Sequence, residues 1–256
     1  MTKPVYEDVL SEHAGLESAL ADPAVHRDHL RARRLRRCLA ALEPLHAIAV
    51  RLREAEEDLA AAVELEWEAE AERLSAQAAA LRDDLAARLA LRDPRDPYDV
   101  VVFVAGHAPR VASLVRRYRD LAEERGWSVQ DLDDRPGPES FHRVALAVTA
   151  REDAMGPWAA LKHENGRSGV RADGRADETF ARVTVVPEGL DPTDLAPDDL
   201  RLDTYCTRRP EQRPDVWLTH LPSGVQVRGR GAHPIEAKAA ALRQIRALLA
   251  AGDPGP

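Results

Sequence analysis

The residues whose types could carry chemistry gather towards the C-terminal end of the chain. Residues 201–246 hold nine basic and four acidic side chains, a balance of +5, although the whole chain of 256 residues carries −8. One arginine guanidinium group can donate two hydrogen bonds to the same phosphate. The stretch therefore predicts a surface that contacts RNA. The alternative, arginines that are merely solvated, stays open. The candidate contact residues are Arg208, Arg209, Gln212, Arg213, Arg228, Arg230 and Lys238.

Other kinds of site find little support in the residue spacing. His26 and His29 lie three apart but have no obvious third ligand, so we expect no metal site. Ser223 stands close to His220, but no acid or oxyanion turn accompanies the pair. No glycine-rich turn from strand to helix is present that would cradle a phosphate or nucleotide. We therefore expect no cofactor.

Residues 5–92 are predicted to be helical, because apolar side chains recur there at gaps of mostly three and four. Proline is poorly tolerated inside a helix, so Pro44 is expected to divide this run. The product would be a helical hairpin or a three-helix arm. A stretch rich in proline and aspartate, residues 92–99, marks the expected end of the arm.

The rest of the chain mixes strands and helices. Residues 93–199 predict strands at 100–104, 127–132, 143–149 and 182–186 and a helix at 110–126, with a mobile loop at 165–179. Residues 200–250 predict a strand at 200–205, a hairpin at 216–227 and a closing helix at 236–249. The expected fold class is α+β, with a helical arm (1–92), a central α/β domain (93–199) and a small hairpin and helix domain (200–250).

The N-terminus has no apolar export signal, and no stretch of apolar residues is long enough to span a membrane. Cys38 and Cys206 have no partner spacing and are expected to be reduced thiols. A cytoplasmic location with no membrane partner is the expectation.

Three segments of the last domain carry a family resemblance. They are DLRLDTY (199–205), THLPSGVQVR (219–228) and EAKAAALRQIRALL (236–249). In this order they resemble the catalytic domain of bacterial class-I peptide chain release factors. Residues 93–106, 162–166 and 182–188 resemble that family's second domain, and the helical arm resembles its first domain in pattern. The resemblance covers most of residues 44–249 and implies a ribosomal partner, with contacts to ribosomal RNA and the acceptor end of tRNA.

The chain departs from the family where the family's chemistry resides. Between Tyr205 and Thr219 the family carries a long loop with Gly-Gly-Gln, whose glutamine backbone N–H stabilises an oxyanion. Here Gln212 follows Pro210 and Glu211, and the loop is about six residues shorter, which removes up to about 10 Å of reach from a hairpin tip. Proline fixes φ where glycine would be free, and Glu211 adds negative charge beside a developing negative charge.

Two further departures concern partners. The family's codon-reading tripeptide, Pro-x-Thr or Ser-Pro-Phe, is missing from residues 166–180. The chain also stops after its closing helix, where the family continues into a segment that completes the second domain's sheet. An uncovered sheet edge is expected to follow, which would be open to a protein partner or to self-association.

The leading functional hypothesis is a non-enzymatic, release-factor-like protein that binds the ribosome without hydrolysing peptidyl-tRNA or reading stop codons. Two alternatives stay open. One is a release-factor scaffold reused for protein–protein interaction off the ribosome. The other is a residual peptidyl-tRNA hydrolase that uses Gln212.

Overall fold

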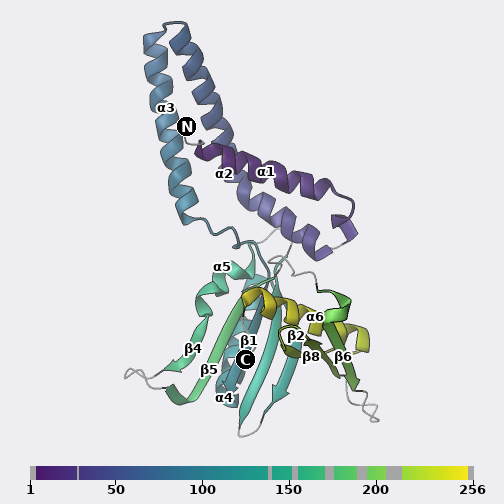
Figure 1. Ribbon diagram of the computed structural model, residues 1–256. Helices are drawn as coiled ribbons and strands as arrows, with labels where there is room; N and C mark the ends of the chain where they lie inside the picture. The colour runs from purple at the N-terminus through teal and green to yellow at the C-terminus, as the bar shows by residue number, and fades with distance from the viewer. Residues whose placement is uncertain are drawn as a thin grey trace. The chain divides into compact units, whose positions relative to one another are not determined.

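The chain folds into two compact units, Met1–Pro97 and Tyr98–Pro256 (Figure 1). The computed structural model describes residues 4–27, 29–137, 140–151, 155–170, 176–188, 195–205 and 215–252. The boundary between the units lies within the proline and aspartate stretch expected to end the arm. The α+β class is confirmed. The further boundary expected at residue 199 falls inside the second unit, and the three-domain division stays a prediction.

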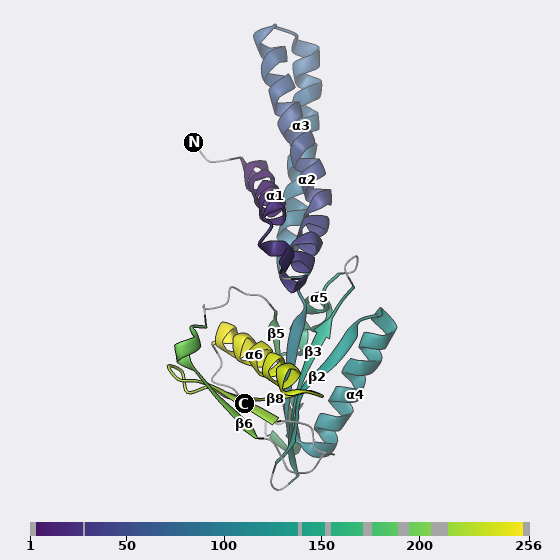
Figure 2. The same ribbon diagram turned by 90° about the vertical axis from the view of Figure 1, so that its right-hand side faces the viewer.

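The first unit is helical. Its elements are α1 (Val5–Ala21), the short 3-10 helix η1 (Val25–Arg27), α2 (His29–Glu64) and α3 (Glu68–Leu91). α1 lies beside α2, and α3 returns antiparallel to α2 (Figure 2). Apolar side chains at helical spacing on all three α-helices share one core, in which Leu42, Leu52 and Leu85 are almost completely buried.

The expectation that Pro44 divides the helical run is wrong, because α2 continues through it. Proline removes one backbone hydrogen bond, here the bond to the carbonyl of Ala40. Pro44 and Ala40 are both exposed, so water can solvate that carbonyl. Leu42 and Leu45 on either side of the proline are buried in the core and hold the helix together. The helical run is interrupted instead near residues 22–27 and 65–67.

A five-stranded antiparallel sheet forms the centre of the second unit. Its strands are β1 (Val100–His107), β2 (Ser128–Pro136), β3 (Phe141–Thr149), β4 (Gly166–Val170) and β5 (Ala176–Pro187), in the order β2-β3-β1-β5-β4. The central strand β1 is buried on both faces over residues 100–105. This double burial explains why its sequence is continuously apolar instead of alternating.

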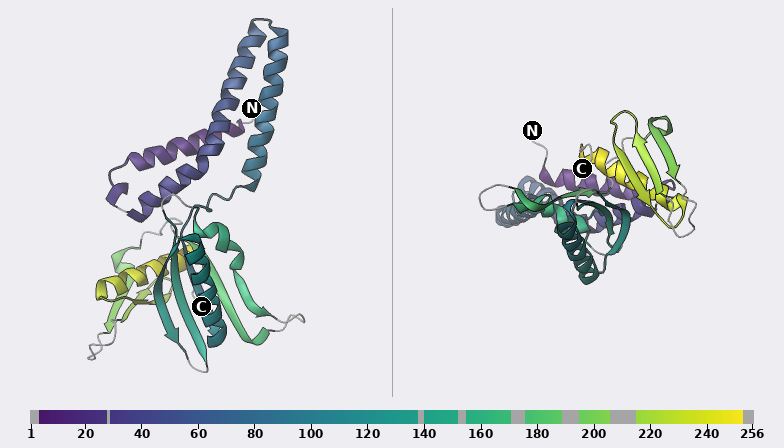
Figure 3. Two further views of the ribbon diagram at one scale, coloured as in Figure 1. Left: turned by 180° about the vertical axis from the view of Figure 1, so that it is seen from behind. Right: turned by 90° about the horizontal axis from the view of Figure 1, so that it is seen from below.

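The two faces of this sheet are covered by different elements. Val100, Val102 and Val104 pack with α4 (Ala108–Arg125). Val101 and Phe103 point the other way, to a core shared with a second sheet and α6 (Pro234–Ala251). The second sheet contains β6 (Leu200–Tyr205), β7 (Asp215–His220) and β8 (Gln226–Arg230) in sequence order. α4 and α6 therefore lie on opposite faces of the five-stranded sheet (Figures 2 and 3).

The prediction of a mobile loop over residues 165–179 is also wrong in its extent. Residues 166–170 form β4, which pairs antiparallel with β5, and β5 begins at Ala176. Backbone hydrogen bonds do not depend on apolar side chains, so β5 can pair with a polar, glycine-containing neighbour. Residues 171–175 lie outside the described part of the chain. The remaining elements are α5 (Pro157–Leu161), η2 (Lys162–Glu164) and η3 (Pro197–Asp199).

Among the described helices, none combines the length and the apolar character needed to cross a membrane.

β8 and α6 pack unusually closely, and Gly229 permits it. A Cβ atom at this glycine would lie 1.8 Å from the carbonyl oxygen of Ala237 and 2.8 Å from the Cβ of Ala241. The facing positions on α6 are alanines, whose small side chains allow the strand backbone to approach the helix closely. Both partners of this contact are therefore restricted to small residues.

We expect Gly229→Ala to lower the free energy of unfolding by about 2 kcal/mol or more, since backbone atoms of α6 would have to move. Chemical denaturation followed by circular dichroism measures the change. Gly15→Ala is the control, because nothing lies near that position in α1 and the substitution should stabilise a helix by about 0.5–1 kcal/mol. An unchanged stability in Gly229→Ala would contradict the close packing.

Candidate nucleic-acid interface

The segment expected to contact tRNA connects the ends of β6 and β7. Arg208, Arg209, Gln212 and Arg213 belong to residues 206–214, which lie outside the described part of the chain. The residues that flank the segment, Tyr205 and Asp215, are paired across the two strands. Because the two ends of this nine-residue connection lie side by side, its tip can extend from the sheet by only about half of its full length, or roughly 15 Å. The sequence of the segment contains no glycine.

Arg228, on β8, is held inside the protein. Its Nε donates to a carboxylate oxygen of Asp133 at 2.9 Å, and a terminal nitrogen donates to the carbonyl of Asp134 at 2.8 Å. The side chain is 15% exposed and that of Asp133 is 8% exposed. Burial raises the pKa of Asp133, and the charge and hydrogen bond of Arg228 oppose that rise. Arg228, which was expected to contact RNA, therefore has a structural role in this conformation.

The other two described candidates differ from each other in their surroundings. Arg230 donates to the carbonyl of Asp134 at 3.3 Å, and its guanidinium lies 3.8 Å from the Asp134 carboxylate. Its side chain is 38% exposed, so part of the group faces water. Lys238 is exposed on α6. The structure thus brings Arg228 and Arg230 together on β8 and leaves Lys238 apart on the helix.

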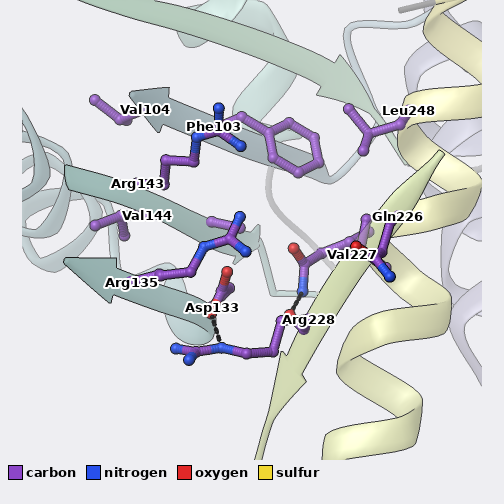
Figure 4. Close-up of a pocket in the computed structure, with 12 residues that line it drawn as sticks. Phe103, Val104, Asp133, Arg135, Arg143, Val144, Gln226, Val227, Arg228 and Leu248 are labelled. Atoms are coloured by element: carbon purple, nitrogen blue, oxygen red, sulfur yellow. Dashed lines mark hydrogen bonds and ion pairs between the residues drawn. The ribbon is translucent and has the colours of Figure 1, made fainter. Parts of the chain in front are cut away.

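A cavity of about 60 Å³ lies between the five-stranded sheet, β8 and α6, and we call it the arginine pocket (Figure 4). Its apolar wall is formed by Phe103, Val104, Val144, Ala145, Val227 and Leu248. Its polar wall is formed by Asp133, Arg135, Arg143, Gln226, Arg228 and Gln244. The volume is about that of two water molecules in the liquid. A cavity of this size suits a small anionic group such as a single phosphate.

Arg135 and Arg143 are the residues that sequence reasoning missed. They occupy directly paired positions on β2 and β3, so they lie on the same face of the sheet. Both line the arginine pocket and both are half-buried. Like charges opposite each other on paired strands destabilise a sheet. Among the described residues, neither guanidinium has a carboxylate within ion-pair distance.

The electrostatics of the pocket follow from this pairing. Burial lowers the pKa of Arg143, and the neighbouring positive charge of Arg135 lowers it further. Arg143 lies over the ring of Phe141, and Arg135 lies over the ring of Trp217. These cation–π contacts orient the side chains but neutralise no charge. The pocket therefore carries an excess of positive charge that an anion would compensate.

The edge of β2 is partly covered by hydrogen-bonding side chains. Gln244, almost fully buried on α6, donates to the carbonyl of Leu132 at 3.3 Å and to that of Arg228 at 2.7 Å. Together with Arg228 and Arg230, it occupies outward-facing carbonyls of β2. The opposite edge is β4, which pairs only with β5 in the described sheet. Self-association through an uncovered edge stays a prediction, and β4 is the strand to which it applies.

His220 and Ser223 do come together, with Nδ1 and Oγ 2.7 Å apart. The same hydroxyl accepts from the backbone N–H of Val225, and the N–H of Gly224 donates to the carbonyl of His220. All these contacts lie within the turn between β7 and β8. They stabilise the turn, and no carboxylate ion pair to this histidine occurs among the described residues.

Comparison with known protein families gives one match, over residues 9–170, to the model described as the PCRF domain. The chain is similar to "Peptide chain release factor 1" of Frankia casuarinae, at 35% identity over 97% of this chain and 78% of the relative. The protein of the same name from Rhodococcus jostii is 34% identical over 96% of this chain and 76% of the relative. For Frankia the matched stretch spans 278 residues, more than the 256 of the whole chain. This chain is therefore shorter than that relative within the matched region.

Among solved structures, "RF2 of Thermus thermophilus" is similar, with a TM-score of 0.52 and 25% sequence identity. The similarity covers 94% of this chain and 76% of that one.

The two kinds of arginine in the pocket should respond in opposite ways to substitution. We expect Arg228→Met to lower the free energy of unfolding by about 3–5 kcal/mol, because Asp133 would be left buried without its partner. We expect Arg143→Met to leave it unchanged or to raise it by up to about 1 kcal/mol, because a like-charge contact disappears. Urea denaturation of both variants measures the difference. Equal destabilisation by the two substitutions would mean that Arg143 is also a structural residue.

Proposed function

The chain belongs to the class-I peptide chain release factor family, and on this premise we propose that it binds the ribosome without cleaving peptidyl-tRNA or reading stop codons. A role related to translation termination follows from the family. The observation that carries the finer proposal is the sequence of residues 206–214, which lacks glycine and places Pro210 and Glu211 before Gln212.

Three physical requirements of the family's chemistry bear on that segment. A backbone amide must be presented to a developing oxyanion. Gln212 keeps its N–H, but Pro210 restricts the backbone before it and Glu211 places negative charge beside it. The chain must approach the ester closely, which glycine allows and proline with its ring does not. The reach must also be correct, since a misplacement of about 1 Å already matters. The paired ends of β6 and β7 limit that reach to roughly 15 Å.

Binding to ribosomal RNA requires accessible positive charge, and the second unit of the chain provides it. The arginine pocket presents Arg135 and Arg143 without carboxylate partners among the described residues, and Lys238 is exposed on the same unit. Arg208, Arg209 and Arg213 add positive charge within the nine residues between β6 and β7. Guanidinium groups of this kind suit phosphate oxygens of ribosomal RNA. We assign the pocket arginines and Lys238 to backbone phosphate contacts, which need no sequence readout.

One observation favours the second candidate, a scaffold for protein–protein contact off the ribosome. Arg228 and Arg230, both expected to contact RNA, are engaged with Asp133 and Asp134 on β2. The net charge of −8 also opposes non-specific RNA binding. The two candidates differ in whether the purified chain associates with ribosomes, and in how that association depends on salt.

Co-sedimentation with ribosomes separates them. We expect binding at low salt that weakens steeply as salt rises, because each phosphate contact releases counterions. The double substitution Arg135→Gln with Arg143→Gln should reduce the slope of log affinity against log salt by about two, one for each lost contact. Arg116→Gln, an exposed arginine on α4 across the sheet, is the matched control and should change neither quantity. Absence of binding at low salt would favour the off-ribosome scaffold.

Release of nascent peptide from loaded ribosomes tests the catalytic part. We expect no release above buffer, and no further effect of Gln212→Ala. The double substitution Pro210→Gly with Glu211→Gly provides the two glycines but not the missing length, so it should also stay inactive. A measurable rate that disappears in Gln212→Ala would show that the chain is a hydrolase. Activity gained by the double variant alone would show that reach is sufficient.

A further inference from the structure

A cluster of metal-ligating groups lies between α1 and α2 of the first unit. One ligand atom each of His13, Glu43 and His46 can be chosen so that all lie within 4.8 Å of one another. Nε2 of His13 is 3.2 Å from a carboxylate oxygen of Glu43. The rings of His13 and His46 stack with their centroids 3.7 Å apart and an interplanar angle of 14°.

The helices explain why these groups meet. Glu43 and His46 are three residues apart on α2, so they share one face of the helix. That face is turned towards α1, which contributes His13 from the opposite side of the contact. Glu17 follows His13 by one helical turn, and its carboxylate lies 3.4 Å from Nδ1 of His13. Two imidazoles and two carboxylates are thus presented by two packed helices.

We propose that this cluster binds a divalent metal ion of the zinc type, with His13, Glu43 and His46 as ligands. Zinc favours nitrogen and carboxylate ligands at about 2.0–2.2 Å, so the three ligand atoms would move together and the His46 ring would turn out of the stack. A fourth position would be filled by water. The donor set excludes a calcium-type site, which requires oxygen ligands throughout.

Glu17 gives the cluster a feature that a simple hydrogen bond between helices does not need. A metal-bound histidine usually donates its second ring N–H to a carboxylate, which fixes the tautomer and the ring orientation. The groups around His13 are placed for this arrangement, with Nε2 towards Glu43 and the Glu17 carboxylate 3.4 Å from Nδ1, close enough to accept its N–H after a small side-chain movement. The tautomer with the proton on Nδ1 leaves Nε2 free to bind the ion.

Access and burial are also suitable for a reversible site. The His13 side chain is 9% exposed, so one ligand is held rigidly at the base of the cluster. The Glu43 side chain is 65% exposed and gives an ion a route from solvent. Bound metal would cross-link α1 to α2, and the site is independent of the ribosome-binding function proposed above.

Metal binding by the purified full-length chain tests the proposal. After treatment with EDTA and removal of the chelator, Zn²⁺ is titrated by calorimetry, and Co²⁺ is followed by its visible absorption. We expect one ion per chain, the absorption of a four-coordinate Co²⁺ site and a higher melting temperature of the first unit with Zn²⁺. His46→Ala and Glu43→Gln should weaken binding at least tenfold, and Glu17→Gln by about 10–100-fold.

The controls separate this site from adventitious binding. Glu54→Gln on α2 and His163→Ala in the second unit replace exposed residues of the same types and should bind as the parent does. Glu43→Gln keeps a hydrogen-bond acceptor for His13, so an intact fold by circular dichroism is expected beside the lost affinity. Zn²⁺ binding that is absent, or equal in His46→Ala and in the controls, would overturn the proposal.

Discussion

The ion pair between Asp133 and Arg228 is the contact on which the arrangement of the second unit depends. It joins β2, the edge strand of the large sheet, to β8 of the small sheet, across 95 residues of sequence. Burying two charges is costly unless hydrogen bonds satisfy them. Arg228 meets this condition by also donating to the Asp134 carbonyl, and Gln244 bonds the backbone of both strands. Asp133, Arg228 and Gln244 also line the arginine pocket, so this join forms one of its walls.

This join also changes what the basic residues can do. An arginine that balances a buried aspartate cannot leave for a phosphate without exposing that aspartate to an uncompensated burial cost. The positive charge available for a ligand is therefore shifted from β8 to the paired strands β2 and β3, where Arg135 and Arg143 face each other. The net charge of a segment shows that basic residues are present, but the local ion pairs decide which of them can bind.

Local patterns in the sequence were sufficient for most elements of the fold. β1, α4 and α6 follow from an apolar run and from apolar spacing, because burial determines those patterns directly. The predictions for Pro44 and residues 166–170 are wrong, because tertiary packing and strand pairing decide the conformation at both places. The helix at Pro44 is held by the core around Leu42 and Leu45, and β4 is held by the backbone of β5.

The same limit applies to the sites, although residue types could be identified. Charge alone marks Arg228 and Arg230 as candidate RNA contacts, whereas their partners on β2 follow only from the packing of β8 on that strand. The pairing of Arg135 with Arg143 depends on hairpin register, which a bulge between Asp131 and Asp133 shifts. His13 and Glu43 are 30 residues apart on different helices, so a search for ligand spacing along one helix could not find them.

Binding and hydrolysis place unequal demands on this fold, and under the proposed function that difference would allow binding to persist without hydrolysis. Phosphate contacts require charge at roughly the correct place, and they tolerate changes in loop length because they are long-ranged and spread over several side chains. Hydrolysis requires one backbone amide at one position, carried at the end of a loop with the correct length and dihedral freedom. Both sheets, α6 and the arginine pocket lie outside residues 206–214. Under the function proposed above, a substituted connection between β6 and β7 would remove the demanding function and leave the scaffold for the permissive one intact.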